Sequence, residues 1–272
     1  MSAPIAAFER FTGSRLRALC RVCVREIAIR CALVFLPIYL TQINPQLNSP
    51  LHNQNKPFDR LPMLETTDLE CQRGDRRLFA GVGFRLEDGE LLYLQGSNGS
   101  GKTSLLRMLC GLLPPAAGRI LWRGQPIGKL GEDYRRELCF LGHHNAIKEE
   151  LTPLENLTTS AVLADAPLDE GQALEALELL GLAGREDLAC RYLSQGQKRR
   201  VALARLVNER RPLWLLDEPF VALDAAAVDL VAGLIGAHLQ RGGLAVLTTH
   251  QPVEIAAGTA RQLVLTREMA SC

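Results

Sequence analysis

The chain carries the glycine-rich stretch Gly96-Ser97-Asn98-Gly99-Ser100-Gly101-Lys102-Thr103. It satisfies the pattern G-x-x-x-x-G-K-[ST], in which successive backbone N–H groups converge on the phosphates of a nucleotide. In such a loop the lysine reaches the β- and γ-phosphates, and the threonine hydroxyl binds Mg²⁺. The stretch by itself predicts a site for a nucleoside triphosphate and Mg²⁺.

The sequence around this stretch favours a functional loop over a chance match. An apolar segment at 91–95 predicts a short strand that runs into the loop, and 103–112 predicts a helix that leaves it. Two further apolar runs, 213–216 and 244–248, are continuous, which is typical of strands buried on both faces of a parallel sheet. We therefore predict an α/β fold.

Two acidic residues, Asp217 and Glu218, follow the run at 213–216. They are expected at the C-terminal end of a parallel strand, where open α/β sheets bind their ligands. A carboxylate oxygen of Asp217 would orient Mg²⁺ through water, and Glu218 would act as the general base for an attacking water. The alternative for an Asp-Glu pair after an apolar run is a helix N-cap. The position of the Asp-Glu pair downstream of the glycine-rich loop favours the catalytic interpretation.

The charge of the chain is divided unevenly. The net charge is +1, so no global field favours a nucleic-acid partner. Residues 1–62 carry eight Lys/Arg and three Asp/Glu, whereas residues 63–272 carry an acidic excess.

The apolar segment 31–40 is broken by Pro37 and is shorter than the ~20 residues that cross a bilayer. The eight cysteines show no disulfide-framework spacing, and the lone pair Cys20/Cys23 is interpreted as incidental.

We therefore expect residues 63–272 to form the nucleotide-binding domain and residues 1–62 to be an extension outside it. The extension would be disordered, or would come from an upstream start codon chosen in error. A competing interpretation is a basic amphipathic segment that lies on anionic lipid.

A second motif, Leu193-Ser194-Gln195-Gly196-Gln197, resembles the LSGGQ signature of the ATP-binding cassette (ABC) ATPases. The resemblance implies that Ser194 and Gly196 close over the γ-phosphate bound by a second copy, in an ATP sandwich dimer. The segment 219–224 resembles the D-loop of that family, and His250 matches its switch histidine, which contacts the γ-phosphate. The family fold is a mostly parallel core sheet with an antiparallel β subdomain and a helical subdomain, here roughly 147–192.

Two positions depart from the consensus of the ABC family. Where the family places an aromatic side chain that stacks on adenine, this chain has Arg73, whose guanidinium plane could also stack. Where the family places a glutamine that senses Mg²⁺, this chain has His143. The other interpretation of His143 and its neighbour His144 is a pair of exposed loop histidines.

Within the family, the segments 142–157, 199–206 and 247–252 resemble the ATP-binding subunit of the heme exporter in bacterial cytochrome c maturation systems. The resemblance implies ATP hydrolysis at the cytoplasmic face of the inner membrane, by a peripheral subunit that binds an integral membrane permease and no nucleic acid. We expect residues 141–156 to grip that permease, although the leucines there could instead be plain core.

Three alternatives stay open at this point. A transporter ATPase for another cargo would carry the same motifs, and only the subfamily resemblance separates it from the heme exporter. ABC ATPases of DNA repair place long coiled coils between the two motifs, and translation-type ABC proteins carry two cassettes in one chain. Here only about 90 residues separate Lys102 from Ser194.

Overall fold

The computed structural model describes residues 63–250, 253–256 and 258–266. The predictions for residues 1–62, and for the cysteine pair within them, fall outside this part of the chain. The first strand, β1, begins at Leu64, next to the predicted start of the domain at Met63.

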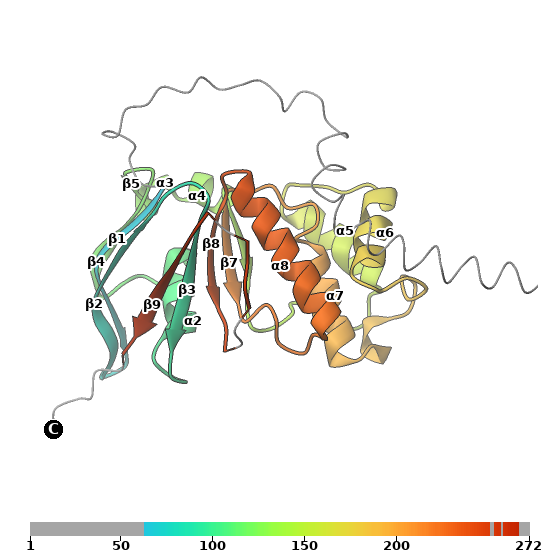
Figure 1. Cartoon of the computed structure of the whole chain (residues 1–272), viewed down its shortest axis with the longest axis horizontal. Coiled ribbons are helices and arrows are strands. Elements are labelled where there is room, and N and C mark those ends of the chain that lie inside the picture. The colour runs from blue at the N-terminus through green and yellow to red at the C-terminus, as the bar shows by residue number, and fades with distance from the viewer. Residues whose placement is uncertain (1–62, 251–252, 257, 267–272) are drawn as a thin grey trace, which may run out of the picture. The chain divides into compact units, whose positions relative to one another are not determined.

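The centre of the fold is a five-stranded sheet in the order β6-β7-β8-β3-β9 (Figure 1). Every neighbouring pair in it is parallel, as the continuous apolar runs predicted. Its strands are β3 (Glu90–Gly96), β6 (Leu138–Leu141), β7 (Leu213–Asp217), β8 (Leu244–Thr248) and β9 (Thr259–Leu265).

A second, antiparallel sheet has the order β2-β1-β4-β5. Strand β1 is irregular where Asp68 has a φ of 48° and the register with β4 shifts. Gly118 of β4 (φ +85°) faces this irregularity, and a Cβ there would collide with the carbonyl oxygens of Thr67 and Asp68. Only glycine therefore permits this close approach. The strands are β1 (Leu64–Arg73), β2 (Arg76–Leu86), β4 (Ala117–Trp122) and β5 (Gln125–Pro126).

The helices divide into two groups. One group follows the glycine-rich loop and β5, and the other forms the helical region on the far side of the parallel sheet (Figure 1). The first group is α2 (Lys102–Leu109), α3 (Ile127–Leu130) and α4 (Glu132–Arg136). The second is α5 (Pro153–Leu163), α6 (Glu170–Leu179), the 3₁₀ turn η2 (Cys190–Tyr192), α7 (Gln195–Ala204) and α8 (Ala225–Gln240).

The helical region, predicted at roughly 147–192, is broken in the middle. Thr152 forms a capping box with Glu155 at the start of α5. Asp165 then adopts a φ of 56°, and Asp169 forms a second capping box at the start of α6. The segment 151–188 therefore contains two short helices, α5 and α6, joined by a turn.

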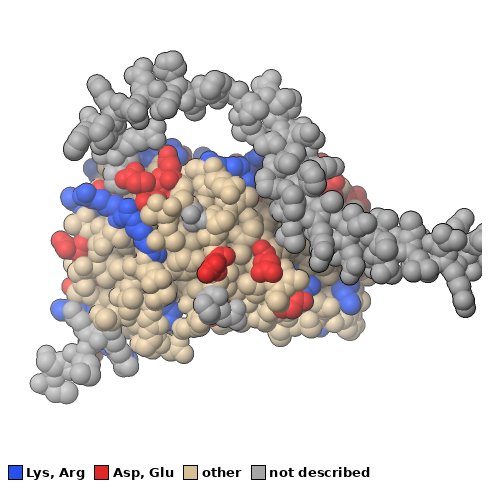
Figure 2. Space-filling view, in the orientation of Figure 1, with Lys and Arg blue, Asp and Glu red and all other residues tan. Residues whose placement is uncertain are grey.

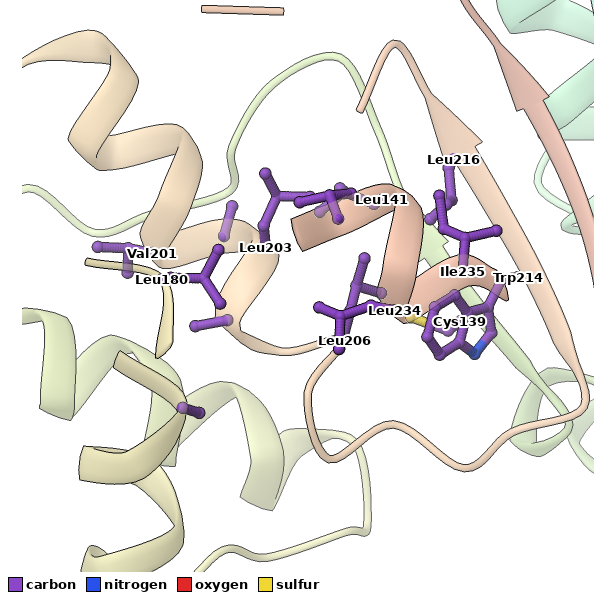
Figure 3. Close-up of a cluster of buried hydrophobic side chains, with 14 of the residues drawn as sticks. Cys139, Leu141, Leu180, Val201, Leu203, Leu206, Trp214, Leu216, Leu234 and Ile235 are labelled. Atoms are coloured by element: carbon purple, nitrogen blue, oxygen red, sulfur yellow. The ribbon is translucent and has the colours of Figure 1, made fainter. Parts of the chain in front are cut away.

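The parallel sheet has a hydrophobic cluster on each face. Along β7, Trp214 and Leu216 belong to the cluster shared with α5–α8, whereas Leu213 and Leu215 belong to the cluster shared with α2 and the antiparallel sheet. Figure 3 shows Trp214, Leu216 and Ile235 in the first of these clusters. Burial on both faces explains why β7 reads as an unbroken apolar run.

The described surface is mixed in charge. On the face shown in Figure 2, Lys and Arg gather on the side of the antiparallel sheet, while the area around α8 is mostly uncharged with a few acidic side chains. The cysteines at 71, 110, 139 and 190 are free and buried. Within the described ranges, no helix is long and apolar enough to cross a membrane.

Candidate active site

The glycine-rich loop joins β3 to α2, as predicted. Gly96 and Gly101 have φ values of 145° and 103°, and a Cβ at either would stand under 3.0 Å from Leu265 or Phe79. The loop is therefore tightly packed, and it ends at the N-terminus of α2, an arrangement suited to a phosphate. Lys102 Nζ lies within the same loop and donates a 2.7 Å hydrogen bond to the carbonyl of Gly96.

Asp217, at the end of β7, is buried and accepts a hydrogen bond on each carboxylate oxygen. Thr103 Oγ1 donates to Oδ2 at 2.9 Å, and Thr248 Oγ1 donates to Oδ1 at 2.7 Å. A threonine hydroxyl and a carboxylate are the hard oxygen ligands that suit Mg²⁺. No group of three or more His, Cys, Asp or Glu in the described ranges could hold a metal by itself. Phosphate oxygens and water would have to complete the coordination of the ion.

Glu218 is fixed through both its backbone and its side chain. It has a φ of 51°, a conformation that costs roughly 1–3 kcal/mol for a residue other than glycine. Its N–H donates to Thr248 Oγ1 at 2.8 Å, and its carbonyl accepts from Arg199 Nη2 at 2.7 Å. Its Oε1 lies 3.1 Å from Nε2 of His250. The two residues predicted to act at the γ-phosphate are therefore in contact.

One hollow of about 520 Å³ brings the predicted nucleotide-binding residues together. Arg73, from the end of β1, and Glu218, from the end of β7, share it with the glycine-rich loop. Arg76, which no sequence motif indicated, pairs with Arg73 across β1 and β2 and also lines this space. The full lining is Arg73, Arg76, Leu78, Asn98, Gly99, Gly101, Lys102, Thr103, Ser104, His143 and Glu218.

A neighbouring hollow of about 390 Å³ contains Asp217, and Thr103 and His143 line both spaces. His143 therefore borders both the hollow that contains Asp217 and the one that contains Glu218. Both His143 and His144 are exposed, and their ring centroids are 5.6 Å apart. The geometry thus suits the alternative of a loop histidine pair as well, and the metal role of His143 stays a prediction.

The signature residues lie away from this hollow. Ser194 caps α7 by accepting a hydrogen bond from the N–H of Gln197, and neither Ser194 nor Gly196 is in the lining. Figure 1 shows α7 well separated from α2. A Cβ on Gly196 would stand 2.7 Å from the carbonyl oxygen of Ala222, so this glycine allows α7 to pack against the D-loop.

Two further residues of the site were not predicted as such. Thr248 is completely buried and contacts both Asp217 and Glu218. Arg199 is buried in α7 and donates to the carbonyls of Asp217 and Glu218. A signal for Arg199 existed, because the helical spacing from it leads to Ala202, Leu203 and Leu206, all on the core face.

The fold and the site define a P-loop ATPase of the ATP-binding cassette class, and the ABC transporter family matches residues 79–221. Solved structures agree with this class. A putative ABC transporter ATP-binding protein from Pyrococcus furiosus aligns with a TM-score of 0.64 at 25% identity, covering 74% of this chain and 96% of that one. The ATP-binding subunit of another ABC transporter aligns at 0.62 and 28% identity, covering 69% and 79%.

Curated relatives narrow the class further. The cytochrome c biogenesis ATP-binding export protein CcmA of Dechloromonas aromatica is 71% identical over 203 residues, covering 75% of this chain and all of the relative. The CcmA of Nitrosospira multiformis is 55% identical, covering 76% and 100%, and that of Escherichia coli is 46% identical, covering 77% and 99%. The chain belongs to the CcmA family of ABC ATP-binding proteins. It is an ATPase that binds ATP, and the predicted fold class and family resemblance are confirmed.

Proposed function

We propose that this chain is the ATP-hydrolysing motor subunit of an export complex that handles heme for the assembly of c-type cytochromes. The relatives are named as cytochrome c biogenesis export proteins, which supports this process. The observation that carries the catalytic part is the position of Glu218 in the hollow of the glycine-rich loop, with its carboxylate against His250.

The residues of the hollow suit in-line hydrolysis of a γ-phosphate. The loop N–H groups and Lys102 hold the phosphates and offset the charge that develops in the transition state. Glu218 orients the attacking water and takes its proton, and His250 holds the Glu218 carboxylate and contacts the γ-phosphate. Arg73, with Arg76 beside it, offers a planar cation on which the adenine can stack.

Mg²⁺ is the metal that the site suits. Thr103 and Asp217 would hold it, directly or through water, and His143 would contact its hydration shell. When bound, the ion neutralises phosphate charge and fixes the geometry of the γ-phosphate.

The active unit is a dimer of two copies arranged head to tail. Each copy keeps its signature residues Ser194 and Gly196 away from its own hollow. The helix N-terminus that Ser194 caps is suited to a phosphate, which the second copy would supply. Nucleic acid has no role in this assembly.

An integral membrane permease is the third component, and it would place residues 63–272, as the ATP-binding domain, at the cytoplasmic face of the inner membrane. The segment 142–150 is mostly exposed and follows β6, so it can contact the permease while His143 lines the hollow. The leucines that follow belong to the core instead, because Leu157 is buried in the hydrophobic cluster shared with α5–α8 and Leu154 packs against that cluster. The contact surface is therefore the polar part of the predicted segment.

Two variants test the proposal in the complex that co-purifies with its membrane subunits. Lys102→Ala should abolish ATP turnover by removing charge from the phosphate site. Glu218→Gln should lower kcat on the order of 10²-fold, keep ATP bound and trap the dimer on size exclusion. If Glu218→Gln hydrolysed ATP at the wild-type rate, the role of Glu218 as general base would be refuted.

The heme role needs a cellular readout. In cells without the native gene, the wild-type chain should restore covalently attached heme in c-type cytochromes, and Glu218→Gln should not. If Glu218→Gln, shown to lack ATP turnover, restored the cytochromes fully, the chain would not drive this process.

A further inference from the structure

Arg199 is a buried cation at the junction of three parts of the molecule. It belongs to α7, six positions after Leu193 in the signature segment, and is only 4% exposed. One arm of its guanidinium, Nη2, donates to the carbonyls of Asp217 (3.1 Å) and Glu218 (2.7 Å). The other arm, Nη1, donates to the carbonyl of Gly142 (3.2 Å) and to Oδ1 of Asn145 (3.1 Å).

A charge at this depth must be compensated by its partners. Burial lowers the pKa of the Arg199 guanidinium, while the carboxylates of Asp217 and Glu218 oppose that shift. Arginine stays protonated even so. Its Nε has no hydrogen-bond partner among the described residues, so the group is held through its two arms alone. Each arm reaches a different element of the active site.

We propose that Arg199 is a positioning residue that holds Glu218 in its catalytic orientation and links that orientation to the loop that carries His143. The proposal rests on the role of Glu218 as general base given above.

The contacts around Glu218 explain how the positioning works. The peptide group before Glu218 is held by Thr248, which accepts its N–H, and the one after it by Arg199, which donates to its carbonyl. With both peptide planes held, the unfavourable φ of 51° persists, and this backbone sets the direction of the side chain toward His250. Without the Arg199 donor, the backbone can relax and turn the carboxylate away.

The same side chain connects α7, the helix that Ser194 of the signature motif caps (the signature helix), to the proposed general base Glu218. Because Arg199 lies on α7, a displacement of that helix moves the donor for the carbonyl of Glu218 and the donor for the 142–145 loop together. Closure of a second copy on α7 would therefore change the position of the base in the first copy.

The test is steady-state ATP hydrolysis by the full complex with Arg199→Gln. A neutral amide cannot reach both elements, so kcat should fall on the order of 10²-fold while KM for ATP stays within about threefold. Arg199→Lys keeps the charge as a single point that can reach the Glu218 carbonyl but cannot span both partners, and should recover part of the loss. Arg191→Gln removes an exposed arginine whose guanidinium lies 4.9 Å from the ring centroid of Tyr192, and serves as the surface control.

The double variant separates positioning from other effects. If Arg199 acts through Glu218, then Arg199→Gln should lower the residual single-turnover rate of Glu218→Gln by less than about twofold. A multiplicative further loss, or wild-type kcat in Arg199→Gln, would overturn the proposal. An active Glu218→Gln single variant would instead refute the role of Glu218 as general base. The two proposals are therefore tested separately, the positioning role by the activity of Arg199→Gln and the general base by that of Glu218→Gln. Should thermal melting show that Arg199→Gln is unfolded, Arg199→Lys carries the same comparison.

Discussion

Oγ1 of Thr248 donates a 2.7 Å hydrogen bond to Oδ1 of Asp217. The same oxygen accepts the N–H of Glu218 at 2.8 Å, so one buried hydroxyl at the end of β8 orients both acidic residues at the end of β7. Thr103, from the phosphate loop, contacts the other oxygen of Asp217. The proposed metal ligand and the proposed general base are thereby both held by a hydroxyl of the neighbouring strand.

Thr248→Val tests this relationship with nearly the same side-chain volume. It should lower the free energy of unfolding by about 1–3 kcal/mol, because the N–H of Glu218 loses its buried acceptor. Hydrolysis should fall on the order of tenfold and need more Mg²⁺, since Asp217 loses the donor that orients it. Thr248→Ser keeps the hydroxyl and should behave almost as the wild type. Equal rates for the valine and serine variants would show that the hydroxyl does not orient the acids.

His238 makes the stability of the fold depend on pH. Its ring stacks on Trp214 with centroids 4.0 Å apart, and Nε2 donates to the carbonyl of Leu244. Burial lowers the pKa of His238 from 6.5 to about 4. The unfolded chain therefore takes up this proton first, and the stabilisation present above pH 6.5 is lost as the pH falls toward 4.

We expect His238 to account for a loss of about 3 kcal/mol in unfolding free energy between pH 7 and pH 4. Urea unfolding of the wild type and of His238→Phe, which keeps an aromatic stack without the titration, should give curves that converge toward low pH. An NMR titration of the ring should place the folded pKa about two units below that of an exposed histidine. Parallel stability curves, or an ordinary pKa, would contradict this assignment.

The order of elements could be read from the sequence because it follows from local patterns. The continuous apolar run of β7 reflects burial on both faces, and the capping box at Thr152 fixes the start of α5. The break between α5 and α6 was less visible. It depends on a left-handed residue, Asp165, and on a second cap at Asp169, both of which a leucine pattern does not report.

The site could be predicted as a set of motifs but not as a network. The sequence predicts that Thr103 and Asp217 bind Mg²⁺ and that Glu218 acts on the attacking water, because each belongs to or follows a recognisable loop or strand. It could not show that Thr248 and Arg199 join them, because those contacts depend on parallel pairing of β7 with β8 and on the packing of α7. Roles that need a second copy or a nucleotide, such as those of Ser194 and Arg73, stay predictions.

Lys148 is the better position at which to test the permease contact. Lys148 and Glu149 both lie in the segment expected to contact the permease, so charge reversal at either would test that contact. Glu149, however, accepts a 2.5 Å hydrogen bond from Lys198 on α7. Lys198 is nearly buried, so Glu149→Lys would leave two cations together and disturb the signature helix. Lys148 is exposed, and its contacts within the described part of the chain are made by its backbone, with Asn156 and Leu151.

We therefore expect Lys148→Glu to change stability by less than about 0.5 kcal/mol and to keep basal ATPase activity. It should weaken co-purification with the membrane subunit and lower covalent heme in c-type cytochromes. Glu149→Lys should reduce basal ATPase as well. If Lys148→Glu lost basal and transport activity in equal measure, the exposed loop would be needed for folding or chemistry rather than for the partner.

Gly196 tests the contact between the signature helix and the D-loop. Alanine is the better helix former, so an ordinary helical glycine gains about 0.5–1 kcal/mol on replacement. At Gly196, however, the added Cβ would stand 2.7 Å from the carbonyl oxygen of Ala222, whose φ of 63° leaves it little freedom to move. Gly233 of α8 has nothing within 4 Å of the same Cβ position and provides the matched control.

Gly196→Ala should therefore displace residues 221–223 from α7 and spoil the surface that we propose closes on the second copy. ATP binding by the separate chain should stay within about threefold of wild type, because the glycine-rich loop and Asp217 are untouched. The ATP-dependent dimer of Glu218→Gln should no longer form when Gly196→Ala is added, as size exclusion would show. Gly233→Ala in the same background should dimerise normally and melt at an equal or higher temperature. A dimer of undiminished stability in Gly196→Ala would mean that this helix and the D-loop do not form the interface, because the clash cannot be relieved without moving one of them.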